Sequence, residues 1–267
     1  MGYSNFYPSS GMFHASLPML MGTRIDVLLF GDNSSQLENV WECMEMELRR
    51  FEKLLNRFDP ESEVANINKY AHFSKFNLSD ELWDIMLDCR QYYEKTDGFF
   101  DITHSNFEKI VFFDKTHDIL LDKYGMILDF GGYAKGYALK YVRKALREAG
   151  VERALVNFGN SSVLALGAHP YSDSWPICLD DLSIINGQSS FLLNDASLSV
   201  SGNTSSLKPH IFNPKTGELI GGAKLVAIVA EDPLDAEVLT TAWIASDYHH
   251  KPEWMLTFNL INTYRIK

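Results

Sequence analysis

One segment of the sequence combines a glycine pair with the start of an expected helix. It reads Leu128-Asp-Phe-Gly-Gly-Tyr-Ala-Lys-Gly-Tyr-Ala138. Gly131 and Gly132 let the backbone approach a ligand closely, and the N–H groups of a first helical turn favour a pyrophosphate, with Lys135 as a nearby positive charge. The segment matches neither the G-x-G-x-x-G pattern nor the P-loop pattern. A pyrophosphate site and a purely structural turn are therefore equally good interpretations of this segment alone.

A possible metal site lies on the last expected helix. Glu237, Thr240 and Thr241 stand at positions i, i+3 and i+4 and share one helix face. One carboxylate and two hydroxyls are hard oxygen ligands of the kind that Mg²⁺ accepts together with water and phosphate. On spacing alone, a solvated first-turn acid beside two packed threonines is the better interpretation.

A possible base lies before a turn, in His210-Ile-Phe-Asn-Pro-Lys-Thr-Gly217. A histidine takes up and releases protons near neutral pH. A lone histidine before a turn is nevertheless more often a structural hydrogen-bond partner, and that interpretation leads when the segment is considered by itself.

The composition limits the ligands that this chain can bind by bulk charge. Its 267 residues include 24 basic and 35 acidic ones, which gives a formal net charge of −11, and 46% of the residues are apolar. These values indicate a globular protein with a sizeable core, and they argue against a disordered chain and against nucleic-acid binding. A phosphorylated ligand must be held locally, by backbone N–H groups, a few cations or a metal ion. The cysteines, Cys43, Cys89 and Cys178, are far apart and are expected to be buried free thiols.

The sequence shows no apolar run of membrane-spanning length, since the richest stretch, 225–230, has the size of a strand. The N-terminal residues lack the pattern of a signal peptide. We therefore expect a cytoplasmic protein without a membrane span from the chain as given, and a periplasmic one if a leader was removed.

The positions of apolar and turn residues predict the elements that hold these segments. Helices are expected over 35–57, over 79–95 with Ser79 as N-cap, over 133–149 with Gly150 as the terminating residue, and over 233–246. Strands are expected over 23–30, 119–121, 125–130 and 154–158, and strands and turns dominate 161–230. The sequence thus predicts one α+β domain, with residues 1–18 as a lead-in and residues 19–267 as the domain.

The short segments also occur in a characteristic order. They are Met21-Gly-Thr23, Asn56 to Asn68, Thr96 to Thr103, the 128–138 segment followed by Ala154 to Gly159, Ser201-Gly202-Asn203, His210 to Gly217, and Ala236 to Ala242. In this order they resemble the ApbE family of FAD:protein FMN transferases, over roughly residues 19 to 247. The match is specific because many short motifs occur in one order.

The resemblance implies a T-fold-like α+β domain that binds FAD with Mg²⁺ and transfers FMN to a Ser or Thr of an acceptor protein, releasing AMP. Some members instead hydrolyse FAD to FMN and AMP. A flavin-binding protein without turnover, or a scaffold that binds no flavin, are further alternatives. By position, the resemblance implies a catalytic His210, a metal shell made of the Ala134 carbonyl with Glu237, Thr240 and Thr241, and an FAD site lined by Met21, Phe58, Phe99, Phe100, Asp101, Gly131, Tyr137 and Phe212.

The chain departs from the family pattern at several places near the implied site. Glu237 stands where the family usually has Asp, and Phe58 stands where it has Tyr. Gly159-Asn160-Ser161 replaces the usual Gly-Gly-Asp. The stretches from Asp101 to Asp129 and from Asn203 to His210 are shorter than usual. These departures leave the implied fold intact and concern the shape of the ligand pocket.

Overall fold

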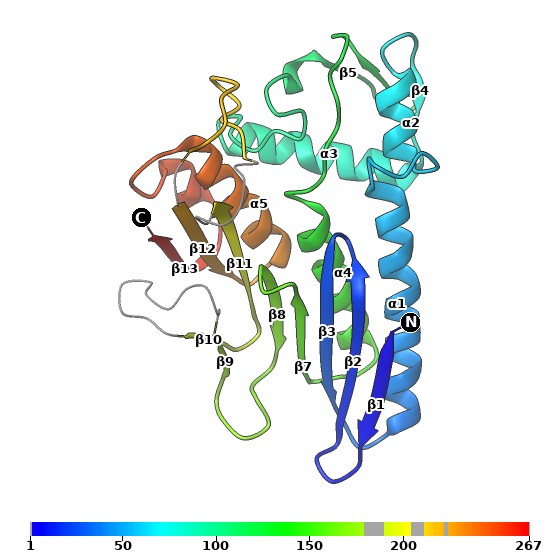
Figure 1. Ribbon diagram of the computed structural model, residues 1–267, viewed down its shortest axis with the longest axis vertical. Coiled ribbons are helices and arrows are strands. Elements are labelled where there is room, and N and C mark those ends of the chain that lie inside the picture. Colours follow the sequence, from blue (N-terminus) through cyan, green and yellow to red (C-terminus); the bar gives the residue numbers. More distant parts are fainter. Residues whose placement is uncertain (1, 179–189, 204–210, 222–223, 267) are drawn as a thin grey trace.

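The main layer of the protein is an eight-stranded antiparallel sheet. The computed structural model describes residues 2–178, 190–203, 211–221 and 224–266 (Figure 1). The strand order is β1-β2-β3-β7-β8-β11-β12-β13, and every neighbouring pair is antiparallel. The strands are β1 (Tyr3–Tyr7), β2 (Met12–Leu20), β3 (Thr23–Phe30), β7 (Arg153–Phe158), β8 (Ser162–Leu166), β11 (Ala196–Asn203), β12 (Lys224–Ala230) and β13 (Leu260–Ile266).

Alternation of apolar residues fixes which face of the sheet is buried. In β3, Ile25, Val27 and Leu29 are fully buried, and β3 pairs with β7 so that Val27 lies opposite Val156. Since successive side chains of a strand point to opposite faces, one face of β3 packs into the core. The strand predicted over 23–30 is confirmed.

Three helices cover this face of the sheet: α1 (Ser34–Leu55), α4 (Ala134–Glu148) and α5 (Pro233–Ser246) (Figure 1). The buried side chains of α1 recur at three- and four-residue steps, as the sequence predicted. Gly150 follows α4 with φ of +72°, the left-handed conformation expected after the end of a helix. Almost every residue of α5 is buried, because this helix contacts α4 as well as β8, β11 and β12. The predictions for these three helices are confirmed.

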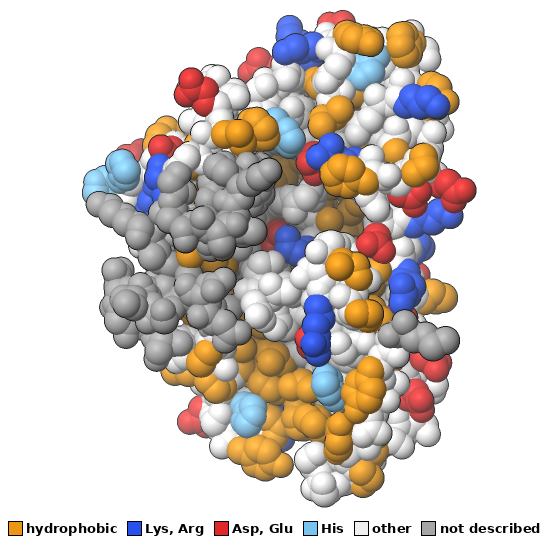
Figure 2. Space-filling view, viewed as in Figure 1, with side chains coloured by type: hydrophobic (Ala, Val, Ile, Leu, Met, Phe, Trp, Pro, Cys, Tyr) orange, Lys and Arg blue, Asp and Glu red, His pale blue; other side chains and the backbone are white. Residues whose placement is uncertain are grey.

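The opposite face of the sheet is also apolar. Figure 2 shows hydrophobic side chains gathered over β3, β7 and β8 on this face. A two-stranded antiparallel sheet of β9 (Trp175–Ile177) and β10 (Phe191–Leu193) packs against part of it, where Trp175 and Phe191 are buried together with Leu198 and Val229. The sheet therefore has core on both faces near β8, β11 and β12.

A smaller unit lies beside the main sheet, at the top of Figure 1. It consists of α2 (Glu63–Tyr70), α3 (Asp80–Lys95), the 3-10 helix Phe107–Lys109, and a three-stranded sheet of β4 (Phe76–Asn77), β6 (Asp118–Leu121) and β5 (Ile110–Phe113). The side chain of Ser79 accepts a hydrogen bond from the N–H of Leu82 at the start of α3, which confirms the predicted N-cap. A second 3-10 helix, Glu253–Thr257, follows α5.

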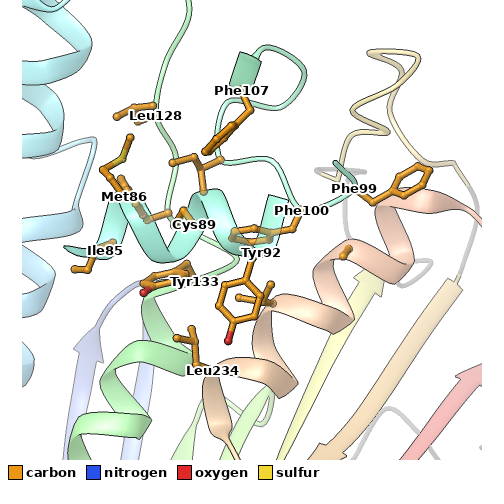
Figure 3. Close-up of a cluster of buried hydrophobic side chains, with 14 of the residues drawn as sticks. Ile85, Met86, Cys89, Tyr92, Phe99, Phe100, Phe107, Leu128, Tyr133 and Leu234 are labelled. Carbon is orange, nitrogen blue, oxygen red and sulfur yellow. The ribbon is translucent and has the colours of Figure 1, made fainter. Parts of the chain in front are cut away.

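One hydrophobic cluster joins the smaller unit to α4 and α5 (Figure 3). Cys89 and Tyr92 of α3 pack there with Phe100, Tyr133 and Leu234. Burial raises the pKa of the Cys89 thiol well above its usual range, which favours the neutral form. Cys43 and Cys178 are exposed, so the expectation of buried thiols is right for Cys89 and wrong for these two.

Other differences from the sequence-based expectation are local. Residues 1–18, expected as a lead-in, contain β1 and most of β2, and Phe13, Ala15 and Leu17 alternate into the core. Of the strand expected over 125–130, Gly125 lies in a turn with φ of +77°, and residues 126–130 have no strand pairing. The Asn68 side chain takes the place of a partner strand, bonding the Leu128 N–H at 2.7 Å and the Leu128 carbonyl at 3.0 Å. In the described part of the chain, no helix combines the length and apolarity that crossing a membrane requires.

Candidate functional site

A cavity of about 650 Å³ opens where the smaller unit meets α4, α5 and the end of the main sheet. Several parts of the chain supply its walls. They are the loop after α3 (Phe99–Ile102 and His104), the segment around the start of α4 (Asp129, Gly131, Gly132 and Lys135), the β7–β8 turn (Gly159, Asn160 and Ser161), β11 (Val200–Gly202), and α5 (Glu237, Thr241 and Ala245), together with Ile211, Phe212, Pro214 and Leu225. The cavity thus brings together most of the segments that the sequence singled out.

Glu237 is a buried carboxylate with three polar partners. It lies in the first half of α5, and the residue is 2% exposed. Its Oε2 accepts hydrogen bonds from the hydroxyls of Ser162 at 2.6 Å and Ser199 at 2.8 Å. Lys135 Nζ lies 2.5 Å from Oε1. A carboxylate taken out of water requires such partners, so the serines of β8 and β11 and the lysine of α4 hold this charge inside the protein.

Two glycines let α4 approach α5 closely enough to form this arrangement. A Cβ added at Gly136 would lie 2.7 Å from the Cβ of Glu237 and 2.9 Å from the Cα of Leu234. A Cβ at Gly132 would lie 2.8 Å from the side chain of Thr241. All three distances are too short for a real side chain, so the close contact between the two helices requires glycine at both positions.

The two threonines of α5 differ in what they face. Thr240 is fully buried, and its Oγ1 donates to the carbonyl of Glu237 at 2.9 Å and accepts from Ser201 Oγ at 2.9 Å. Thr241 lines the cavity, and its Oγ1 lies 3.2 Å from the same carbonyl. Thr240 therefore ties α5 to β11, while Thr241 faces the space where a ligand would bind.

The turn before α4 uses several of its N–H groups internally. The N–H groups of Tyr133 and Ala134 both donate to the carbonyl of Phe130 at 2.9 Å, and the Gly131 N–H donates to Asp129 Oδ1 at 2.9 Å. Fewer N–H groups face a ligand here than an open first helical turn would offer. The side chain of Lys135 is therefore an important source of positive charge in this wall.

The Phe99-Phe100-Asp101 segment performs three separate tasks. Phe100 points into the cluster of Figure 3, with its ring 6.0 Å from that of Tyr92. Phe99 belongs to the same cluster, and its ring centre lies 5.2 Å from that of Tyr248. Asp101 Oδ1 accepts from the N–H of Thr103 at 2.7 Å and from its hydroxyl at 2.6 Å, which shapes the loop. Burial raises the pKa of Asp101 above its usual value, although these hydrogen bonds act in the opposite direction.

An ionic cluster that the sequence did not indicate lies in the same wall. Asp129 Oδ2 is 3.0 Å from Arg57 Nε and 3.5 Å from His104 Nε2. Burial alone would raise the pKa of Asp129, but the hydrogen bonds from His104 and from the Gly131 N–H, and the charge of Arg57, bring it below the usual value. The only hint in the sequence is that Arg57 and Asp129 belong to the quoted motifs and that His104 directly follows one of them.

Several residues that the resemblance assigned to the FAD site do not line this cavity. Phe58 is 78% exposed, and the guanidinium carbon of Arg57 lies over the Phe58 ring, 4.1 Å from the ring centre. Tyr137 donates from its hydroxyl to Glu81 at 3.0 Å. The N–H of Met21 donates to Glu52 at 2.8 Å. Ala134 and Thr240 are likewise absent from the lining, whereas Phe99, Phe100, Asp101, Gly131, Phe212, Glu237 and Thr241 belong to it. His210 lies outside the described residues, next to Ile211 and Phe212, which line the cavity.

Solved structures share the fold of this chain. The structure of an ApbE protein from Thermotoga maritima superposes with a TM-score of 0.76 at 22% identity, covering 88% of this chain and 86% of that one. The flavin transferase ApbE from Vibrio cholerae superposes with a TM-score of 0.75 at 16% identity, covering 90% and 88%. These likenesses confirm the α+β, ApbE-like architecture that the sequence predicted.

Sequence comparison agrees with the fold. A protein named FAD:protein FMN transferase from Klebsiella pneumoniae (strain 342) is 26% identical over 259 residues, which cover 84% of this chain and 79% of that protein. The sequence profile of the ApbE family matches residues 21–119 and 103–260. The two matched ranges together span most of the sequence, and the chain therefore belongs to the ApbE family.

Proposed function

We propose that this protein transfers FMN from FAD to a Ser or Thr hydroxyl of an acceptor protein and releases AMP. The observation that carries the proposal is the buried contact between Lys135 and Glu237 in the wall of a cavity of about 650 Å³. A cavity of this size is in the range that holds a small-molecule ligand. The similarity to the Klebsiella pneumoniae protein named FAD:protein FMN transferase supports the same activity.

The chemistry of the donor set supports Mg²⁺ as the metal. In the described part of the chain, no three His, Cys, Asp or Glu side chains are grouped as metal ligands. Mg²⁺ does not require such a group, since it keeps waters and binds substrate phosphates with one or two carboxylates. Glu237 Oε1 already lies against a positive charge, that of Lys135, and Thr241 offers a hydroxyl on the same cavity wall. These residues fit a hard cation.

The proposed metal shell of Ala134, Glu237, Thr240 and Thr241 can now be divided by position. Glu237 and Thr241, which line the cavity, would hold the ion directly. The family resemblance adds the carbonyl of Ala134, the first residue of α4, which is not part of the cavity lining. Thr240 would position α5 and Glu237 and would not contact the ion, because its hydroxyl is hydrogen-bonded to Ser201 and to the carbonyl of Glu237. When bound, Mg²⁺ would neutralise charge on the pyrophosphate.

The residues of the chain would supply positioning and charge. Lys135, whose Nζ lies beside Glu237 in the cavity wall, would contact a pyrophosphate oxygen. Phe99 and Phe212 would offer ring faces to the flavin or the adenine. Phosphoryl transfer requires mainly such alignment and charge neutralisation, with little covalent work by the protein. The family resemblance assigns the deprotonation of the acceptor hydroxyl to His210.

The deciding experiment incubates the purified protein with FAD, Mg²⁺ and a candidate acceptor. We expect AMP in solution and a covalent increase in the acceptor mass that corresponds to FMN. AMP and free FMN without an acceptor would show FAD hydrolysis instead. Retained flavin absorbance without AMP would show a binding protein without turnover. If excess FAD and Mg²⁺ do not raise the melting temperature, the chain binds no flavin, because a ligand of the native state must stabilise it.

A further inference from the structure

One face of α3 is hydrogen-bonded to the starts of both helices that carry the proposed site. The hydroxyl of Tyr133, the residue before α4, donates to Asp88 Oδ2 at 2.7 Å. The hydroxyl of Tyr92 donates to Asp235 Oδ1, in the first turn of α5, at 2.6 Å. Asp88 and Tyr92 stand at positions i and i+4 of α3 and therefore share a helix face. A single helix of the smaller unit is thus bonded to α4 and to α5.

The two bonds end next to the residues that meet in the cavity wall. Tyr133 is two residues before Lys135, and Asp235 is two residues before Glu237. Lys135 Nζ and Glu237 Oε1 lie 2.5 Å apart between the same two helices. None of the four hydrogen-bonded residues lines the cavity of about 650 Å³. They can therefore affect a ligand in that cavity only through the positions of α4 and α5.

Both tyrosines are buried, so their hydroxyls need acceptors inside the protein. Tyr133 is fully buried, and Tyr92 is 7% exposed. Figure 3 shows the Tyr92 ring pointing from α3 toward Leu234 at the start of α5, with the Tyr133 ring below α3. A buried phenol requires an acceptor, but many acceptors would satisfy it. Here each bond joins α3 to a different helix of the site, which satisfaction of a hydroxyl alone does not require.

The two bonds add direction to the packing between α4 and α5. Gly132 and Gly136 let the helices approach closely, and apolar side chains fill the surrounding core. Apolar contacts are non-directional, whereas a hydrogen bond weakens steeply away from its preferred angle. The bonds from α3 therefore resist sliding or rotation of the helix starts, which would change the contact of Lys135 with Glu237.

We propose that Asp88 and Tyr92 of α3 act as positioning residues in the FMN transfer. They hold the starts of α4 and α5 so that Lys135 and Glu237 face the same part of the cavity. This inference rests on the proposed function. Loss of either bond should leave the protein folded but should misplace the two helix starts. A misplacement of about 1 Å can lower a rate about 100-fold, even when the altered residue lies far from the chemistry.

The test compares three variants in which one tyrosine loses its hydroxyl and keeps its ring. Tyr92→Phe and Tyr133→Phe each break one of the two bonds. Tyr93→Phe is the matched control, since Tyr93 also belongs to α3 and its hydroxyl donates to Glu108, in the 3-10 helix Phe107–Lys109, at 3.3 Å. Melting curves identify a temperature at which the unaltered protein and all variants are folded, and the measurements are made there.

The first measurement needs no turnover. Acetylation of lysine amines in the ligand-free protein is followed by peptide mass spectrometry, and the rate at Lys135 is divided by the rate at Lys144. The side chain of Lys144 is 73% exposed on α4 and serves as the internal reference. Lys135 is 20% exposed and lies against Glu237, so its amine is poorly accessible. Its acetylation should become severalfold faster in the two bond-breaking variants and should not change in the control.

The second measurement is the maximal rate of AMP release at saturating FAD and Mg²⁺ with an acceptor. It should fall about 10- to 100-fold in the two bond-breaking variants, because a positioning role acts on alignment, and it should stay unchanged in the control. Asp88→Asn keeps an acceptor oxygen for Tyr133 and should retain most of the rate. Asp88→Leu removes the acceptor and should behave as Tyr133→Phe does.

The opposite results would overturn the inference. If acetylation and maximal rate are the same in all these proteins, the two bonds serve stability alone. Faster acetylation with an unchanged maximal rate would show that α3 holds the contact without influence on the transfer, which also contradicts a positioning role. If the unaltered protein releases no AMP with any acceptor, the proposed function fails, and the acetylation of Lys135 still decides whether α3 holds its contact with Glu237.

Discussion

Lys135 Nζ lies 2.5 Å from Glu237 Oε1 at the contact between α4 and α5. The side chain of Glu237 is 3% exposed and that of Lys135 is 20% exposed, so the pair is largely out of water. Removing one partner of a buried pair leaves an uncompensated charge, which costs much more than the pair itself contributes. This single contact therefore links the stability of the fold to the proposed ligand site.

Lys135→Met should destabilise the protein because it leaves the Glu237 carboxylate with hydroxyl partners only. We expect a loss of about 3 kcal/mol in the free energy of unfolding, measured by urea denaturation. The control is Lys140→Met, since Lys140 pairs with Asp232 on the surface, where the loss should stay below about 1 kcal/mol. Equal losses in the two variants would contradict the importance of the buried pair.

Ser199→Ala should destabilise the buried Glu237 carboxylate, because its Oε2 would keep only the hydrogen bond from Ser162. We expect a loss of about 1–3 kcal/mol in the free energy of unfolding. If Glu237 holds Mg²⁺ as proposed, the Mg²⁺ concentration for half-maximal AMP release should rise about 10- to 100-fold, because Ser199 would orient a metal ligand. Ser172→Ala, at an exposed position, should change neither quantity. An unchanged Mg²⁺ requirement in Ser199→Ala would argue against Glu237 as a ligand.

Gly136→Ala should be destabilising although alanine favours helices. The added Cβ would lie 2.7 Å from the Cβ of Glu237 and 2.9 Å from the Cα of Leu234, so α4 and α5 must move apart. We expect a loss of about 1–3 kcal/mol, as for other overpacked sites, visible in thermal and urea unfolding. Gly221→Ala is the control, because no atom lies within 4 Å of the added Cβ there. A stabilised Gly136→Ala variant would show that the helices are not in this contact.

Asp129→Asn should lose stability in a pH-dependent way. The pKa of Asp129 in the folded protein is below its usual value, although burial opposes that shift. A depressed carboxyl pKa contributes stability that is present above the unfolded value of about 3.9 and is lost as pH falls through the folded value. The variant should therefore be less stable than the unaltered protein at pH 7, and the difference should shrink below about pH 4. Urea unfolding at several pH values measures this, and a constant difference would contradict it.

The elements with strong local signals were predictable from the sequence. The apolar stripe of α1, the Ser79 cap of α3 and Gly150 after α4 are each determined by neighbouring residues. The 125–130 segment has the composition of a strand, but it pairs with the side chain of Asn68 instead of a neighbouring strand. Residues 63–70, which form α2, have too few turns for a clear pattern. The structure of these two segments depends on contacts between residues far apart in the chain, which a local pattern does not contain.

The candidate site, too, could be predicted from the sequence only where short motifs indicate it. Gly131, Phe212, Glu237 and Thr241 could be placed in it from short motifs, and they line the cavity. The i, i+3 spacing put Thr240 on the face of Glu237, but the packing of β11 on α5 turns its hydroxyl inward. Arg57, His104 and Asp129 come from three separate loops, and no periodicity relates them. Only the folded chain shows that they meet.

The pairing of β3 with β7 also determines when the sheet can form during synthesis. Residues 31–152, which include α1, the smaller unit and α4, lie between these two neighbouring strands. At the usual rate of translation, the ribosome needs about 6–25 seconds to add this many residues. During that time the β3 edge of the β1–β2–β3 hairpins has no partner strand, and exposed strand edges promote aggregation. The β3 edge is therefore exposed to pairing with other chains until β7 has been synthesised.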